Sequence, residues 1–230
     1  MCFKINTFKI IGLLLAPLIF GCNPTTLDPD QFDERKVYFP DDESLFRVYE
    51  VNRIDFFANG DRDTSKYRLK EKVATKFSAE EEFQVIERYR FRNNEWQLDS
   101  LWNIYYNNTN VVVYENNIPL VKLITPIKSK TTWDRNGFNA REERISEYVY
   151  FSKDTLISDN LYEQVVVVEL DNIIDPIIGN DIGYEVYAPK IGLVSKYIED
   201  VDYKQDQEVG NQVISQGVLL EQKLVTFGYE

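Results

Sequence analysis

The chain has 230 residues, and none of them is histidine. A Ser-His-Asp or Cys-His nucleophile system needs histidine as its base, and many zinc, copper and iron sites use the imidazole ring as a ligand. The absence excludes these hydrolase mechanisms and these metal centres. We therefore expect no catalytic residue, no metal ligand and no cofactor, and we predict that the protein is not an enzyme.

Cysteine is almost as scarce, since the chain has only Cys2 and Cys22. Cys2 lies in a segment with the properties of a secretory signal, in which Lys4 and Lys9 precede an apolar run from residue 10 to residue 20. This run is shorter than the roughly 20 residues of a membrane-spanning helix, and no later apolar run is longer. Loss of the segment leaves one cysteine and therefore no disulfide.

The apolar run ends in Ile19-Phe20-Gly21-Cys22, which resembles the lipobox of bacterial lipoproteins. The resemblance implies cleavage before Cys22, a diacylglyceryl thioether on its sulfur, and acylation of the new N-terminus, for example by palmitate. More than one acyl chain gives stable anchoring, because each buried CH₂ contributes about 0.8 kcal/mol. The alternative is an ordinary signal peptide with Cys22 left as a free thiol. We predict lipid attachment at Cys22.

Acidic side chains outnumber basic ones, 38 to 26, which gives a net charge of −12. Cleavage before Cys22 removes two lysines and no acid, so the remaining chain carries a charge of −14. An acidic surface disfavours nucleic acid and anionic lipid head groups as partners. We expect the protein to meet the membrane through its lipid anchor.

The chain divides into three parts. Residues 1–21 are predicted to be a lipoprotein signal peptide, and residues 22–36 a polar tether that contains two prolines. Residues 37–230 are predicted to form a single β-rich domain, which is long enough to bury a sizeable core.

The clearest pattern in this domain is a period of two between residues 66 and 77. Apolar side chains share one face, at Tyr67, Leu69, Val73 and Phe77, and basic side chains share the other, at Lys66, Arg68, Lys70, Lys72 and Lys76. The alternation predicts a strand with one buried face and one face in solvent. Residues 83–92 repeat it, with Arg88, Arg90 and Arg92 on the polar face. Such a basic strip could bind an anionic polymer, although we favour pairing with surface carboxylates.

No segment shows a long helical period, so the chain is predicted to be all-β with little helix. Short polar turns separate the candidate strands, as in Asn93-Asn94, and favour a curved antiparallel sheet or an open half-barrel. Residues 96–104 also have a period of two, which places Ser100 inward with Trp96 and Trp102.

Several stretches together resemble a group of uncharacterised outer-membrane lipoproteins of Bacteroidota. They are Val37-Tyr38-Phe39-Pro40, Arg47-Val48-Tyr49-Glu50-Val51, Glu95-Trp96-Gln97-Leu98-Asp99-Ser100-Leu101-Trp102, Val121-Lys122-Leu123, Trp133-Asp134-Arg135-Asn136-Gly137-Phe138-Asn139, Tyr184-Glu185-Val186-Tyr187-Ala188 and Ile191-Gly192-Leu193-Val194. The resemblance implies a β-rich lipoprotein of the cell envelope, facing the periplasm or the surface, similar to the open half-barrel of lipoprotein carriers. It implies no catalytic residue.

The loop that begins at Trp133 has the composition of a ligand contact. Trp133, Asp134, Arg135 and Asn136 could stack on and hydrogen-bond a sugar or another flat polar ligand. The alternative is a turn with Asn136-Gly137 at positive φ, in which Trp133 plugs the edge of the sheet. We favour the turn and keep ligand contact as a hypothesis.

Two short motifs, Asp99-Ser100-Leu101 and Asp154-Thr155-Leu156, resemble the O-glycosylation sequence of exported Bacteroidota proteins. The resemblance implies Ser100 and Thr155 as candidate glycan acceptors.

The sequence supports two functions. The favoured one is a non-catalytic envelope lipoprotein that binds or scaffolds an envelope protein, a lipid or a glycan. The other is a carboxylate-based glycan-active enzyme, which needs two carboxylates about 5–9 Å apart, one of them in a desolvated pocket.

Overall fold

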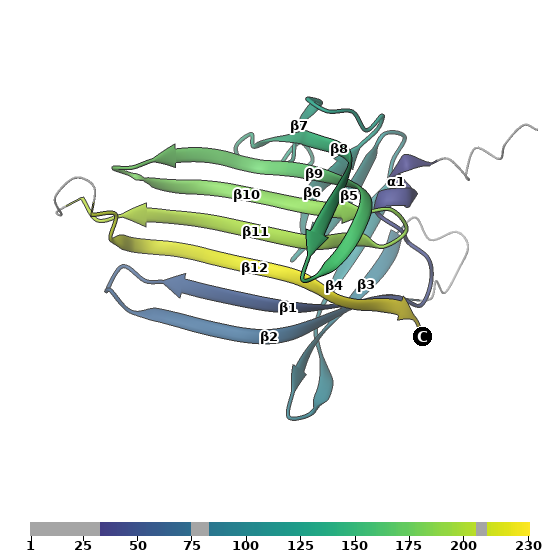
Figure 1. Ribbon diagram of the computed structural model, residues 1–230, viewed down its shortest axis with the longest axis horizontal. Coiled ribbons are helices and arrows are strands. Elements are labelled where there is room, and N and C mark those ends of the chain that lie inside the picture. Colours follow the sequence, from purple (N-terminus) through teal and green to yellow (C-terminus); the bar gives the residue numbers. More distant parts are fainter. Residues whose placement is uncertain (1–32, 75–82, 206–210) are drawn as a thin grey trace, which may run out of the picture.

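The computed structural model describes residues 33–74, 83–205 and 211–230 (Figure 1). The predicted signal peptide, Cys22 and most of the predicted tether lie outside these ranges. The described chain forms one antiparallel sheet of twelve strands and one short helix, α1 (Glu34–Tyr38). The predicted all-β fold with little helix is therefore confirmed. Within the described ranges, no helix is long and apolar enough to cross a membrane.

The sheet consists of two halves, each a run of sequential hairpins. The first half contains β1 (Leu45–Phe56), β2 (Arg62–Val73), β3 (Phe83–Arg92), β4 (Glu95–Tyr106), β5 (Asn110–Glu115) and β6 (Ile118–Ile124). The second contains β7 (Thr132–Asp134), β8 (Ile145–Ile157), β9 (Asn160–Asp175), β10 (Gly179–Ala188), β11 (Gly192–Tyr203) and β12 (Ile214–Tyr229). The halves join where β1 pairs with β12, so the sheet order runs from β6 through β1 and β12 to β7.

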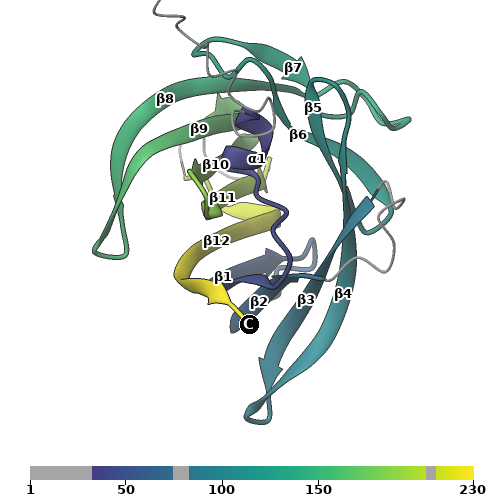
Figure 2. The same cartoon turned by 90° about the vertical axis from the view of Figure 1, so that its right-hand side faces the viewer.

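The two outer strands, β6 and β7, approach each other on the opposite side of the ring. The Val121 backbone N–H donates to the Arg135 carbonyl oxygen at 2.9 Å. The indole N–H of Trp133 donates to the Val121 carbonyl oxygen at 3.0 Å. These contacts bring the curved sheet nearly to a closed barrel (Figure 2).

Two-residue turns hold several of the hairpins in register. Asn93 and Asn94 connect β3 to β4 with φ of 52° and 64°, and Asn116 and Asn117 connect β5 to β6 with φ of 51° and 66°. Asparagine tolerates this left-handed backbone, which matches the twist of the paired strands. The predicted turn at Asn93-Asn94 is confirmed.

Helix α1 covers one end of the ring. Glu34 to Lys36, which end the predicted tether, form most of it, and the Asp33 side chain caps its first turn. Glu34 accepts a hydrogen bond from Ile127 N in the β6–β7 connection, at 2.9 Å. Tyr38 Oη donates to the Gln164 carbonyl oxygen in β9, also at 2.9 Å. In Figure 2 α1 accordingly lies within the ring of strands.

The largest buried cluster surrounds this covered end. Tyr38 and Phe39 pack there with apolar side chains from both halves of the sheet, including Ile104 and Val166, which are 0% exposed. A second cluster joins the end of the β8–β9 hairpin to β10, β11, β12 and the β1–β2 pair, and it includes Val165, which is 0% exposed. Apolar packing thus fills the α1 end and leaves the middle of the barrel for polar side chains.

The predicted orientation of β3 is wrong. Gln84 and Ile86 are each 2% exposed, and Arg88 and Arg90 on the same face line the barrel interior. Phe91 lies on the other face, against Trp96 at 5.2 Å between ring centroids. The rule that places the polar face in solvent fails here because the interior itself is polar. The basic strip predicted across both strands is therefore divided between the two faces of the sheet.

Candidate functional site

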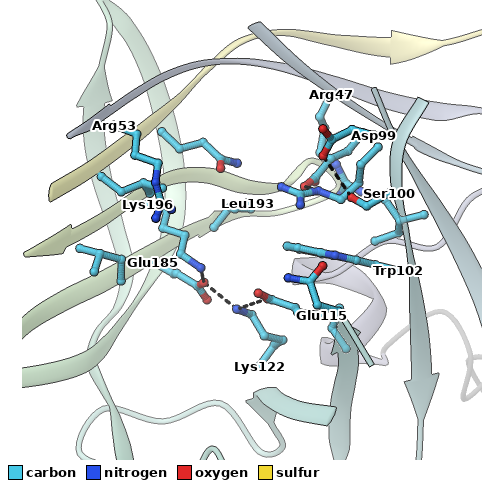
Figure 3. Close-up of a pocket in the computed structure, with 18 of the residues that line it drawn as sticks. Arg47, Arg53, Asp99, Ser100, Trp102, Glu115, Lys122, Glu185, Leu193 and Lys196 are labelled. Carbon is cyan, nitrogen blue, oxygen red and sulfur yellow. Dashed lines mark hydrogen bonds and ion pairs between the residues drawn. The ribbon is translucent and has the colours of Figure 1, made fainter. Parts of the chain in front are cut away.

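A cavity of about 540 Å³ lies inside the barrel, and side chains from nine strands line it (Figure 3). Six of its lining residues are cationic: Arg47, Arg53, Arg88, Arg90, Lys122 and Lys196. Four are acidic: Glu71, Asp99, Glu115 and Glu185. The cavity therefore has an excess of positive charge inside a protein whose net charge is −12.

Strand alternation explains why these side chains point inward. Arg47 and Arg53 are six positions apart on β1, and Arg88 and Arg90 are two positions apart on β3, so the members of each pair lie on the same face of the sheet. Arg88 on β3 is the register partner of Glu71 on the neighbouring strand β2. The neighbouring strands therefore present alternating charges to the same space.

An ion-pair network crosses the interior and connects the two halves of the barrel. Lys122 Nζ on β6 lies 2.6 Å from Glu185 Oε1 on β10 and 3.0 Å from Glu115 Oε1 on β5. Lys196 Nζ lies 3.0 Å from Glu185 Oε1, and Tyr187 Oη donates to Glu185 Oε2 at 2.5 Å. Figure 3 shows the Glu185–Lys122–Glu115 chain as dashed contacts.

The network fixes the charges of its members. Burial alone would raise the pKa of Glu185, but the charges of Lys122 and Lys196 outweigh it and hold this pKa well below its usual range. Burial opposed by Lys122 likewise leaves the pKa of Glu115 lowered. Burial would lower the pKa of Lys122, but its two carboxylate partners raise it. Glu185, Glu115 and Lys122 therefore stay ionised near neutral pH.

On the part of the wall formed by β2, β3 and β4, aromatic rings pack against the guanidinium groups of Arg88 and Arg90. The Arg88 guanidinium carbon lies 3.6 Å from the centre of the Trp102 ring, and Arg88 Nε donates to Glu71 Oε1 at 3.1 Å. The Arg90 guanidinium carbon lies 4.2 Å from the Tyr67 ring centre. Stacking of this kind holds a guanidinium plane in place while its edge stays available to a ligand.

The four residues of the predicted ligand-contact loop lie at the gap between β6 and β7. Trp133 is buried against Tyr148, at 4.6 Å between ring centroids, and sits at the sheet edge as the alternative interpretation expects. Asp134 Oδ1 accepts hydrogen bonds from Asn136 N at 2.9 Å and Arg144 N at 3.0 Å.

Arg135 and Asn136 are engaged in the same way. Arg135 lies 2.6 Å from Asp171 Oδ2 and donates to the Leu170 carbonyl oxygen at 2.7 Å. Asn136 Nδ2 donates to the Glu142 carbonyl oxygen at 2.6 Å. The expected positive φ at Asn136-Gly137 is wrong. Ligand contact by this loop stays a prediction, although Arg135 and Asn136 do line a second cavity of about 640 Å³.

The candidate glycan acceptors occupy different environments. Ser100 lines the interior cavity beside Trp102, whereas Thr155 is half-buried in β8. Within the described ranges no group of three or more acidic, cysteine or histidine side chains is arranged to hold a metal ion.

Sequence reasoning missed the main charged residues of the cavity, namely Arg47, Lys122, Glu185 and Lys196. A signal was present for two of them. Lys122 lies between Val121 and Leu123, and Glu185 precedes Val186 in a strand that is otherwise apolar and aromatic. A charge within an apolar strand indicates a buried ion pair or a polar interior, because an isolated buried charge is too costly.

Comparison with known proteins gives only structural similarity. No protein-family model matches the chain, and no curated protein matches its sequence. One similar solved structure is a protein from Bacteroides fragilis that is inferred to be exported and has a YMCC-like fold, with a TM-score of 0.43 and 12% identity. Another is a protein from Parabacteroides distasonis that is inferred to be a lipoprotein, with a TM-score of 0.44 and 11% identity. Each alignment covers 84% of this chain and 99% of the other.

Proposed function

We propose that the protein is a lipid-anchored lipoprotein of the cell envelope, held at the outer membrane through Cys22, whose barrel interior binds a small ligand without catalysing a reaction. The observation that carries the binding role is the interior cavity. Its volume of about 540 Å³ lies in the range of small-molecule sites, roughly 300–1,000 Å³. Its wall combines apolar side chains with a few charged groups, as such sites do.

The lipid anchor is supported by the sequence. The signal-like segment, the lipobox-type Ile19-Phe20-Gly21-Cys22 and the polar residues after it occur in the order that an acylated, exported protein needs. The short tether then leads directly into α1 at the covered end of the barrel.

The charges of the cavity support binding rather than hydrolysis. Glu115 and Glu185 both contact Lys122, so they are close enough to form a catalytic pair. The pKa of each is lowered, however, so neither holds a proton to donate near neutral pH. A general acid needs a raised pKa.

A fluorescent guest tests the binding role. We would use a Cys22→Ser form, which is free of lipid and keeps every described residue, with the neutral apolar probe N-phenyl-1-naphthylamine. We expect saturable binding to one site. Ser100→Phe or Val218→Phe places a ring in the cavity and should weaken binding at least about tenfold, the effect of losing 1.4 kcal/mol.

The matched control is Thr64→Phe, which adds the same ring on an exposed residue of β2 and should leave binding unchanged. Circular dichroism melts show that each variant is folded. Equal weakening by Thr64→Phe would overturn the interior binding site, and so would absence of saturable binding both of this probe and of its sulfonate derivative.

One observation favours the glycan-active alternative. Asp200 lines the second cavity, and burial together with the neighbouring Asp181 raises its pKa. A carboxyl with a raised pKa is the type of group that acts as a general acid. Release of reducing sugar from envelope glycans by the native protein, and its loss in Asp200→Asn, would establish this activity in place of the binding role.

A further inference from the structure

The interior cavity contains buried hydrogen-bond donors without acceptors. Within the described ranges, three buried side-chain atoms of its lining residues have neither a hydrogen-bond partner nor an ion pair: Arg47 Nε, Arg47 Nη2 and Trp102 Nε1. All three are N–H donors, and no buried acceptor of the lining is left in this condition. Unpaired buried donors are rare in native proteins. A set composed only of donors fits a ligand that supplies acceptor oxygens.

Arg47 differs from the other cations of the cavity. Arg53, Arg88, Arg90, Lys122 and Lys196 each have a carboxylate oxygen at 2.5–3.1 Å. Arg47 has no such ion pair in the described part of the chain. Its Nη1 donates to the Ile191 carbonyl oxygen at 3.2 Å, and the other two nitrogens stay unpaired. A buried guanidinium in this state is costly unless an anion joins it.

The backbone beside Arg47 is shaped to hold it. Gly192 has a φ of +91°, and a Cβ at this position would meet Arg47 Nη1 at 2.5 Å. Glycine thus provides both the conformation and the space for the guanidinium. Glu71 on β2 is the register partner of Arg47 on β1, but its carboxylate accepts a hydrogen bond from Arg88 instead.

The arginines form a series that leads inward. The side chains of Arg53, Arg90 and Arg88 are 40%, 34% and 15% exposed, and Arg47 is 2% exposed. The same cavity has an apolar wall formed by Leu193, Ile198, Val218 and Leu220. A guest would therefore meet positive charge along one wall and apolar surface along the other. In Figure 3 Arg47 and Trp102 lie on the same side of the cavity.

We infer that the ligand is a small amphiphilic organic anion, whose acidic head group is bound by Arg47 and the Trp102 indole N–H and whose apolar body packs on the β11–β12 wall. The inference rests on the proposed binding function and adds the chemical class of the ligand. The head group is a carboxylate, sulfonate or phosphate, since these present acceptor oxygens to a guanidinium.

Two probes that differ by one charged group test the inference. 8-Anilinonaphthalene-1-sulfonate has the aromatic body of N-phenyl-1-naphthylamine and adds a sulfonate. We expect the Cys22→Ser form to bind the sulfonate at least about tenfold more tightly, the gain of one charge-assisted hydrogen bond. The protein's own net charge of −12 opposes this preference, so it can arise only locally.

Arg47→Met should abolish the preference, so that the ratio of the two affinities falls to about one. Trp102→Phe keeps an aromatic ring, removes the N–H and should reduce the preference about fivefold, so it serves as the test if Arg47→Met does not fold. The control is Lys66→Met on the outer face of β2, which removes one positive charge and should change neither affinity.

The outcomes separate the two proposals. If neither probe binds, the interior binding function fails, and the inference fails with it. If the neutral probe binds and the sulfonate binds no better, the binding function stands and the inference is wrong. Persistence of the preference in both Arg47→Met and Trp102→Phe would also overturn the inference.

Discussion

The cavity wall around Arg47 and the loop after β7 both use arginine, and the two regions differ in what the guanidinium contacts. In the loop, Arg135 binds Asp171 and the Leu170 carbonyl oxygen, and Arg144 also binds Asp171. In the cavity, Arg47 has one weak carbonyl contact and two unpaired nitrogens. The loop looks more like a site in sequence, yet its donors are satisfied within the protein. Unsatisfied donors therefore identify a candidate site better than residue type does.

The largest expected effect belongs to Trp133, which lies in β7 directly before the loop. Trp133→Ala removes a buried ring at the junction of β6 and β7 together with its hydrogen bond to Val121. We expect the free energy of unfolding to fall by about 4 kcal/mol, as measured by urea denaturation. Trp96→Ala, on the outer face of the sheet, should cost less than half as much. Equal losses would mean that closure of the ring adds no stability.

The next effect belongs to the cavity. Glu185→Gln leaves Lys196 without a carboxylate and Lys122 with Glu115 only, so we expect a loss of about 3 kcal/mol at pH 7. Glu221→Gln, in a half-exposed pair with Lys223, should cost less than about 1 kcal/mol. A similar cost for both would show that the interior network is not stabilising.

The cost of Glu185→Gln should also depend on pH. Because the pKa of Glu185 is lower in the folded protein than its ordinary value of 4.5, its stabilisation is complete above pH 4.5 and is lost as the pH falls. The stability difference between the wild type and Glu185→Gln should therefore shrink below pH 4.5, by at most about 1.4 kcal/mol per pH unit. A difference that stays constant down to pH 3 would contradict the lowered pKa.

The smallest effect is the most direct test of the comparison. Arg135→Met leaves Asp171 with one arginine partner and should cost about 2 kcal/mol. Arg47→Met removes a buried charge that has no ion pair, and we expect unfolding stability to stay equal or to rise. Chemical denaturation of the two variants side by side measures the contrast. A matching loss in Arg47→Met would place Arg47 among the structural arginines.

The sequence was sufficient for the class of fold and for single strands. The alternation around Leu69 and Val73 correctly identified the buried face of β2, and both side chains are 2% exposed or less. The same alternation rule assigned the two faces of β3 the wrong way round, because it assumes that the interior of the barrel is apolar. Neither the alternation of side chains nor their spacing in the sequence could predict the contact between Lys122 and Glu185, which are 63 residues apart. Their contact depends on which strands face each other across the ring, which the contacts between β6 and β7 and the β1–β12 pairing determine together.

That pairing also has a consequence for biosynthesis. β1 hydrogen-bonds to β12 over residues 45–56 and 217–229, while every other strand pair of the described sheet links neighbours in the chain. During synthesis the hairpins from β1 to β6 can form first, and β1 then has one edge whose backbone groups lack partners. Such an edge accepts any extended segment, including that of another nascent chain. Pairing of β1 with such a segment would compete with the native pairing until β12 is in place.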